Sequence, residues 1–514
     1  MSTRVQRAPD PREVAVFRSD GVARYPEVPP YHPSERYPEY PFGSIVDASP
    51  NVAYDAVRES LALLGLDREN FGTRQWNPLG AIVGPDDFVV IKPNMVRDFH
   101  EEPEKGIEAM ITHGSIVRAV VDYVYIAKGG RGKVVVCDSP QNDADWDGLW
   151  AAFHFDELLD FYGRVAADFD LQVYDVRREA VRKRHGVPVE RYQRPGDPLG
   201  YVAIDLGDDS EFAAVPERTG RLYGAEYDIS ETAGHHSPDR HEYLVAASFL
   251  EADVVINVPK WKTHKKSGIT VWTKSVIGIC GDKNWLPHHT EGTPSQGGDQ
   301  FADDRAKRKL ERRVVALTKR ALLRGGPVRL RAGSILRKLG TYVFGDTNRG
   351  TVRSGNWHGN DTIWRTVLDL HKCWIYADRH GVLKDAPQRR FLCIVDGIVA
   401  GEGNGPLAPT PRHDGIVLAG TDHGAVDTTA AMLMGFDPDR LKILTRSPEA
   451  RGHDLYRVPR ERMQCRSNVA AWDGPLQDLS EPLDWLPHFG WVGYVERRQD
   501  QVPAEPVLSA PSPD

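Results

Sequence analysis

Lysine and histidine side chains gather in one stretch of the sequence, residues 254–289, whose residue types are suited to chemistry. An apolar run over 254–258 ends at Pro259 and is followed at once by basic residues: Lys260, Lys262, His264, Lys265 and Lys266. Ammonium groups attract phosphate and carboxylate groups, and a histidine can exchange a proton near neutral pH. The spacing therefore predicts a site for an anionic small molecule.

The second half of this stretch carries Lys274 in an apolar setting formed by Ile269, Val271, Trp272, Val276 and Ile277. A buried lysine needs either an anionic partner or a lowered pKa. Lysine runs such as Lys265 and Lys266 are more often solvated surface, so this interpretation stays open for them. We expect His264, Lys274 and His288 to be the catalytic groups. Lys283, further along the chain, is expected to bind the substrate.

Short β-branched runs deliver polar residues to strand ends elsewhere in the chain. The run 88–91 leads into Lys92 and Asn94, the run 132–138 ends at Asp138, and the run 391–396 ends at Asp396. Helical patterns separate several of these runs, which predicts right-handed β-α-β units and an α/β fold, a mainly parallel sheet with flanking helices. Ligands of such sheets bind beyond the carboxyl ends of the strands.

Carboxylates at or near these strand ends predict either partners for the lysines or ligands for a divalent metal. Glu402 lies in the glycine-rich stretch 397–405, which we expect to be a flexible loop, and Asp427 lies in a small apolar helix that ends at Gly435. The candidate metal ligands are Asp138, Asp396, Glu402 and Asp427.

Composition divides the chain into several parts. Residues 1–44 are rich in Pro and Tyr and predict an extended arm, whereas 498–514 predict a disordered tail. The α/β domain is expected over 45–300 and 346–497, interrupted by a basic helical insertion at 301–345.

The insertion contains a strongly basic stretch, residues 304–339, with apolar residues at helical spacing. A basic amphipathic helix can lie on an anionic membrane or cover an anionic ligand, and a solvated helix is the plainer interpretation. A protein bound peripherally to anionic lipid or a lipid phosphate is therefore one alternative function.

The whole-chain properties exclude several classes of protein. Of 514 residues, 40% are hydrophobic and 27% charged, and a formal charge of -8 gives no general case for nucleic-acid binding. The sequence shows no signal-peptide pattern and no run of about 18 apolar residues, so we expect a cytoplasmic protein. The cysteines include no C-x-x-C pair, so a local iron–sulfur motif is absent.

Short motifs recur over residues 85–440 in a fixed order. They are Val90-Ile91-Lys92-Pro93-Asn94, Val136-Cys137-Asp138-Ser139-Pro140, Asn257-Val258-Pro259-Lys260-Trp261-Lys262-Thr263-His264, Thr273-Lys274-Ser275, Gly281-Asp282-Lys283, Val395-Asp396-Gly397, Gly405-Pro406 and Ala425-Val426-Asp427. In this set and order the chain resembles the domain-of-unknown-function 362 family.

The resemblance implies an α/β fold but no defined activity. Some family members carry iron–sulfur ferredoxin segments, which implies a second alternative, an iron–sulfur or other metal-dependent redox protein. The cofactor therefore stays open, with a divalent metal as one option.

We expect an enzyme that acts on a phosphate- or carboxylate-bearing small molecule. The substrate would be held by Lys92, Asn94, Lys260, Lys262 and Lys283. Proton transfer beside a carboxylate, as in an isomerisation or elimination, is slightly favoured, because no nucleophile-elbow motif is present. The sequence leaves the oligomeric state open.

Overall fold

The computed structural model describes residues 8–21, 23–184, 187–224, 229–304, 350–455 and 457–497. Almost all of the basic stretch 304–339, and the tail 498–514, lie outside these residues, so the predictions for them stay predictions. No helix within the described ranges is long and apolar enough to cross a membrane.

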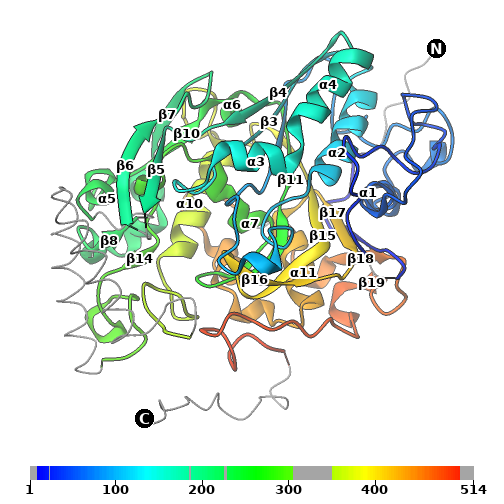
Figure 1. Ribbon diagram of the computed structural model, residues 1–514. Coiled ribbons are helices and arrows are strands. Elements are labelled where there is room, and N and C mark those ends of the chain that lie inside the picture. The colour runs from blue at the N-terminus through cyan, green and yellow to red at the C-terminus, as the bar shows by residue number, and fades with distance from the viewer. Residues whose placement is uncertain are drawn as a thin grey trace, which may run out of the picture.

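A large mixed sheet runs through the protein (Figure 1). The strands follow the order β19-β18-β1-β17-β15-β11-β2-β3-β4, and β12, β13 and β16 join it beside β15. The neighbours from β15 to β4 are all parallel to one another, which confirms the α/β class. These central strands are β15 (Arg390–Asn404), β11 (Val254–Val258), β2 (Val89–Pro93), β3 (Gly132–Asp138) and β4 (Phe169–Asp175).

Helices cover both faces of this sheet, and the strand side chains alternate between two cores. Val89 and Ile91 of β2 join one core, whereas Val90 joins the other. The first core packs against α1 (Val52–Leu63) and α2 (Gly114–Ala127), and the second packs against α10 (Ile363–Tyr376) and α11 (His423–Leu433). The result is a sheet between two helical layers (Figure 1).

The remaining helices and strands lie around the main sheet and its two helical layers. Two helices follow β3, and small sheets β5-β6, β7-β10-β9 and β14-β8 extend one end of the protein. Their bounds are α3 (Trp146–Phe153), α4 (Phe155–Val165), β5 (Glu179–Arg184), β6 (Val187–Gln193), β7 (Tyr201–Asp205), β8 (Leu222–Tyr223), α5 (Ile229–His235), β9 (His236–Ser237), β10 (Arg240–Ala246), α6 (Ala247–Glu251), β14 (His289–Thr290) and α12 (Lys442–Thr445).

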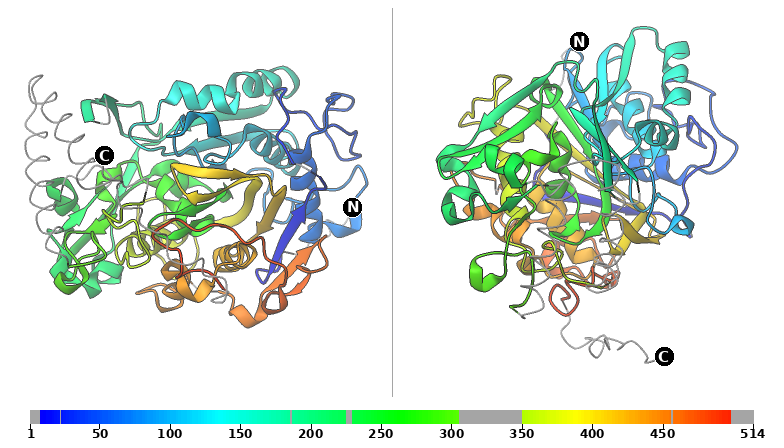
Figure 2. Two further views of the ribbon diagram at one scale, coloured as in Figure 1. Left: turned by 60° about the horizontal axis from the view of Figure 1, so that its bottom comes forward. Right: turned by 60° about the vertical axis from the view of Figure 1, so that its left-hand side comes forward.

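The predicted amino-terminal arm is partly wrong, because strand β1 (Glu13–Arg18) lies inside the main sheet. It runs antiparallel to β17 (Ile416–Gly420) and parallel to β18 (Gln464–Ser467), which pairs in turn with β19 (Gly474–Pro475). Figure 2 shows the blue β1 beside the orange β18 and β19. The run Val14–Val16 is apolar enough to be buried between its neighbours, and the surrounding Pro-rich segments hid this short strand.

The glycine-rich stretch 397–405 is also not a flexible loop, since most of it belongs to the long strand β15. This half of β15 pairs with β12 (Lys260–His264) and with β16 (Ala408–Arg412). Its glycines permit close packing: a Cβ at Gly397 would lie 2.7 Å from the ring of Trp261. Glycine here serves strand contacts rather than mobility.

A buried polar cluster ties the amino-terminal segment to the sheet. Lys260 Nζ lies 2.9 Å from Asp396 Oδ2 and donates to the Tyr25 hydroxyl at 2.6 Å, and that hydroxyl donates to Asp396 Oδ1 at 2.5 Å. Tyr25 also stacks on His113, with ring centroids 4.0 Å apart. Burial raises the pKa of Tyr25 well above its usual value, which keeps the hydroxyl protonated as a donor.

Replacing this hydroxyl tests how firmly the segment is held. Tyr25→Phe keeps the ring but removes a group that bonds Lys260, Asp396 and the backbone N–H of Val399. We expect the free energy of unfolding to fall by about 2 kcal/mol, because buried charged partners lose a hydrogen bond. Urea denaturation of the two proteins measures the difference.

Tyr31→Phe is the matched control for this prediction. Tyr31 is also a buried tyrosine of the same segment and also contacts His113, but its hydroxyl forms no hydrogen bond within the described ranges. Its substitution should leave stability nearly unchanged. Equal effects of the two substitutions would contradict the role given to the Tyr25 hydroxyl.

Candidate functional site

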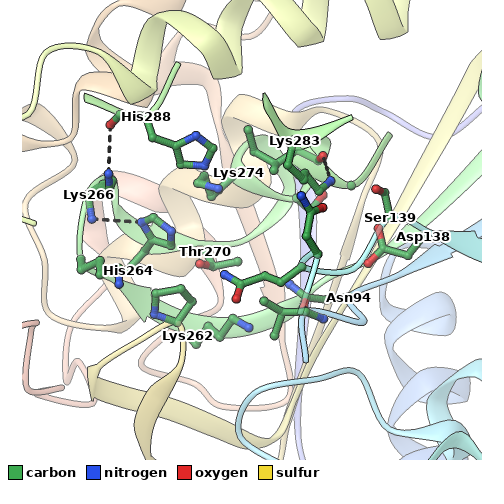
Figure 3. Close-up of a pocket in the computed structure, with 18 of the residues that line it drawn as sticks. Asn94, Asp138, Ser139, Lys262, His264, Lys266, Thr270, Lys274, Lys283 and His288 are labelled. Carbon is green, nitrogen blue, oxygen red and sulfur yellow. Dashed lines mark hydrogen bonds between the residues drawn. The ribbon is translucent and has the colours of Figure 1, made fainter. Parts of the chain in front are cut away.

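A cavity of about 180 Å³ opens at the carboxyl ends of β2 and β3, with β12 along one wall. Figure 3 shows lysine and histidine side chains from several elements pointing into it. Beyond β12 the chain passes through β13 (Gly268–Thr270) into the short helix α7 (Trp272–Ser275), which adds a further wall. The charged and polar lining residues are Lys92, Asn94, Asp138, Ser139, Gln141, Asn142, Asp143, Lys262, His264, Lys265, Lys266, Thr270, Lys274, Ser275, Lys283 and His288.

An ion pair joins the ends of the two central strands. Lys92 Nζ lies 2.9 Å from Asp138 Oδ1, and Asp138 Oδ2 accepts from the backbone N–H of Met95 at 2.8 Å. Gly278 passes so close that a Cβ there would overlap both charged groups. The carboxylate at the end of β3 thus contacts Lys92 through one oxygen and the backbone through the other.

Other buried lysines of the cavity bond to backbone carbonyls instead of carboxylates. Lys262 Nζ donates to the carbonyl of Met110, Lys283 Nζ to those of Ile277 at 2.7 Å and Cys280 at 3.3 Å, and Lys266 Nζ to that of His288 at 3.2 Å. Burial lowers the pKa of Lys283 to about 8 and that of Lys262 well below its usual value. These carbonyls orient the ammonium groups without neutralising them.

Lys274 differs from these lysines because no hydrogen bond or ion pair holds its Nζ within the described ranges. Burial, together with the charges of Lys283 and Lys92, lowers its pKa to about 7. Its helix is nevertheless held firmly: Asp427 accepts from the backbone N–H groups of Trp272 at 2.8 Å and Thr273 at 2.9 Å. A fixed backbone thus presents an amine whose pKa is about 7.

His264 is held as a neutral hydrogen-bond donor. Its Nδ1 accepts from the backbone N–H groups of Lys266 and Ser267, both at 3.1 Å. Backbone N–H groups only donate, so Nδ1 carries no proton and the proton of the neutral ring resides on Nε2. Burial, together with Lys274 and the neighbouring lysines, lowers the pKa of His264 well below its usual value.

His288 has the opposite tautomer. Its Nδ1–H donates to the carbonyl of Leu286 at 2.7 Å, which leaves the lone pair of Nε2 as an acceptor. Burial and the charges of Lys266 and Lys274 lower the pKa of His288 well below its usual value. The cavity therefore contains one imidazole that donates from Nε2 and one that accepts there.

Several lining residues were not among the site residues predicted from the sequence: Ser139, Asn142, Lys266, Thr270 and Gly278. The hydroxyls of Ser139 and Thr270 are buried and form no hydrogen bond within the described ranges, so they are available to a ligand or water. Lys266 was weighed as solvated surface but is buried. For Ser139, its place next to Asp138 at a strand end was the available signal.

The structure brings most of the predicted site together and leaves Lys260 out. The residues that line the cavity are Lys92, Asn94, Asp138, Lys262, His264, Lys274, Lys283 and His288. Lys260 is instead paired with Asp396 in the core. Strict alternation along β12 would place Lys260 and Lys262 on one face, but the pairing with β15 shifts register between them and separates their side chains.

The carboxylates proposed as metal ligands do not converge. Asp138 pairs with Lys92 and Asp396 with Lys260, whereas Glu402 bonds Arg412 at 3.0 Å and Asp427 caps α7. Within the described ranges, the one group of three close metal-ligating side chains is Glu179, Glu231 and Asp282, which belongs to none of these. All cysteines are buried as free thiols and contribute to no such group there.

This fold and cavity define an α/β protein with a lysine-lined pocket at the carboxyl ends of its parallel strands. The family described as Domain of unknown function (DUF362) matches residues 89–190 and 212–432, which is more than half of the chain, so the protein belongs to this family. The family match confirms the resemblance noted from the motifs and assigns no activity.

Other comparisons add little. No curated protein matches the sequence. A crystal structure of a Thermotoga maritima protein from the Northeast Structural Genomics Consortium has 10% sequence identity and a TM-score of 0.27, over 70% of this chain and 53% of that one. The chain thus spans about half the length of that protein, and so weak a likeness carries no argument.

Removing the charge of Lys274 should stabilise the fold. The pKa of Lys274 is about 7 in the folded protein against 10.5 for a free lysine, so its protonation opposes folding below pH 7. We expect Lys274→Met to raise the free energy of unfolding by ~2 kcal/mol at or below pH 7. Each unit of pKa shift corresponds to about 1.4 kcal/mol, and solvent relaxation around the buried charge reduces the total. The gain should shrink as the pH rises from 7 towards 10.5, because the unfolded-state amine then also loses its proton.

Lys92→Met is the matched control, to be measured by urea denaturation in buffers free of sulfate and phosphate. It should lower stability, because Asp138 would remain buried without its ammonium partner. If Lys274→Met is instead as destabilising as Lys92→Met, Lys274 has a compensating partner and its assigned environment is wrong.

Proposed function

We propose that the protein is an enzyme that binds a small phosphate- or carboxylate-bearing substrate in this cavity and catalyses a proton transfer on it. The observation that carries the proposal is the excess of buried ammonium groups over carboxylates: Lys262, Lys274 and Lys283 join Lys92, and of these four only Lys92 has a carboxylate partner within the described ranges. An anion would supply the missing counter-charge.

The polar groups around these lysines suit the recognition of an oxyanion. The Nε2–H of His264 and the unpartnered hydroxyls of Ser139 and Thr270 add neutral donors to the ammonium groups. Donors fixed in a water-poor cavity stabilise negative charge strongly because they need not reorient. Such an arrangement supports an intermediate in which charge develops on a carboxylate or carbonyl oxygen.

Two groups are suited to accept the proton. His288 presents a lone pair at Nε2, and Lys274 has a pKa of about 7, where general bases are most effective. Isomerisation and elimination beside a carboxylate need a base and an oxyanion site and nothing more. This class of reaction is the one that the described residues support best.

Sulfate provides a probe for the anion site because its charge is constant near neutral pH. We expect isothermal titration calorimetry to show binding that weakens at least tenfold in Lys262→Met, since a charged hydrogen bond contributes about 1.5–3 kcal/mol. Lys384→Met makes the same change at a surface lysine whose side chain is 45% exposed, and should bind sulfate as the unmodified protein does.

The pH dependence provides an independent test of the same site. Bound sulfate favours the charged form of Lys274 and raises its pKa from about 7, so binding should take up protons near pH 7 and weaken as the pH rises above 7. Calorimetry in buffers of different ionisation enthalpy measures this proton uptake. Absence of sulfate binding, or binding that Lys262→Met leaves unchanged, would show that the cavity is not an anion site.

A further inference from the structure

We propose that Lys274 is a nucleophile that forms an iminium with its substrate, so that the substrate is an aldehyde or ketone that also carries a carboxylate or phosphate group. This inference rests on the proposed function and narrows it from anionic small molecules to carbonyl-bearing anions. The geometry of Lys274 within the set of cavity lysines carries it.

The bonding pattern of the cavity separates Lys274 from its neighbours. Lys92 is paired with a carboxylate, and Lys262, Lys266 and Lys283 donate to backbone carbonyls, so the Nζ of each of these lysines has an acceptor. Lys274 has no such acceptor within the described ranges, and its side chain ends inside the cavity (Figure 3). A free amine needs no acceptor, whereas a buried ammonium does.

The surroundings of Lys274 favour the free amine still further. The charges of Lys92 and Lys283 act on Lys274, and its own charge acts on Lys262 and His288, so these groups lie within short electrostatic range. Burial beside other cations is a recognised means of activating a lysine for attack on a carbonyl. The pKa of about 7 agrees with this geometry, because both the free amine and the ammonium form are then present at neutral pH.

The backbone of Lys274 is fixed in a way that suits a nucleophile. Asp427 bonds the first N–H groups of α7, and Ser275 bonds Asn257 of β11 at 2.8 Å. The residues on both sides of Lys274 are therefore anchored to α11 and to the sheet. A rigid support of this kind lowers the entropic cost of attack.

The step balances with groups already present. The lone pair of Lys274 Nζ attacks the carbonyl carbon, the C=O π pair moves to oxygen, and the oxygen takes a proton from a neighbouring ammonium group. The proton released from Nζ passes to Nε2 of His288, and His288 then gives this proton to the hydroxyl, which leaves as water. In sum, amine, carbonyl and one proton give an iminium and one water.

An iminium at Lys274 also gives roles to the other charged and basic groups of the cavity. An iminium withdraws electrons from the adjacent carbon and so acidifies its C–H bond, which Nε2 of His288 is placed to deprotonate. The anionic group of the substrate would be held by Lys92, Lys262 and Lys283. The substrate class thus has two parts, a carbonyl for Lys274 and an anion for the lysines beside it.

Reductive trapping tests the proposal on the intact protein. Glyoxylate, an anionic aldehyde, is added with sodium cyanoborohydride at pH 7, and modified lysines are located by peptide mass spectrometry over time. We expect Lys274 to be modified at least tenfold faster than the surface residue Lys384, and sulfate to slow only Lys274. The ratio of the modification rate of Lys274 to that of Lys384 should be smaller with acetaldehyde, which has no anionic group.

Modification of Lys274 no faster than that of Lys384, or insensitive to sulfate, would overturn the proposal. Lys274→Arg keeps the charge but removes the nucleophile, so this variant should still bind sulfate and should lose the rapidly modified site. If the variant does not fold, the positions of the modified lysines in the protein without this substitution still decide whether Lys274 forms the iminium. Sulfate binding without trapping at Lys274 would reject the iminium and leave the anion-binding enzyme standing. Absence of both would reject both.

Discussion

The burial of mutually repelling ammonium groups around one cavity is the constraint to which the rest of the structure responds. Each such group loses hydration worth several kcal/mol, and for Lys92 the carboxylate of Asp138 offsets this cost. Carbonyl oxygens of Met110, Ile277, Cys280 and His288 supply the other acceptors. They come from separate segments, so the whole arrangement of strand ends, α7 and the following turns must be in place for the lysines to be tolerated. A site of this kind is expected to lower stability in exchange for binding strength.

Much of the central sheet and part of the site could be predicted from the sequence. Strand β3 occupies the residues expected for it, and β2 and β11 differ from expectation by no more than two residues at their ends, because their β-branched runs are unambiguous. Lys92, Asp138 and Lys262 meet at one cavity because parallel strands place their carboxyl ends at the same edge of a sheet. That rule uses only local patterns and needs no knowledge of distant partners.

What the sequence could not reveal depends on irregular register and on contacts between distant segments. The shift between Lys260 and Lys262 is set by the pairing of β12 with β15, which no local pattern encodes. Asp427 and Asp396 carry carboxylates of the kind that bind metals. In the structure, however, Asp427 accepts from backbone N–H groups of α7, and Asp396 bonds Tyr25 and Lys260. A carboxylate near a strand end is equally suited to a cation, a helix terminus or a metal, so only the fold decides among them.

The position of strand β1 affects how the chain can be assembled. Its partners, β17 and β18, follow it by some four hundred residues or more, since Val16 pairs with Leu418 and with Ser467. During synthesis on a ribosome, this apolar strand emerges about four hundred residues before the first strand that pairs with it. Its unpaired edges are then open to other nascent chains or to a chaperone. The Tyr25 contact with Lys260 and Asp396 becomes available only slightly sooner, so the amino-terminal segment joins the fold as one of its last parts.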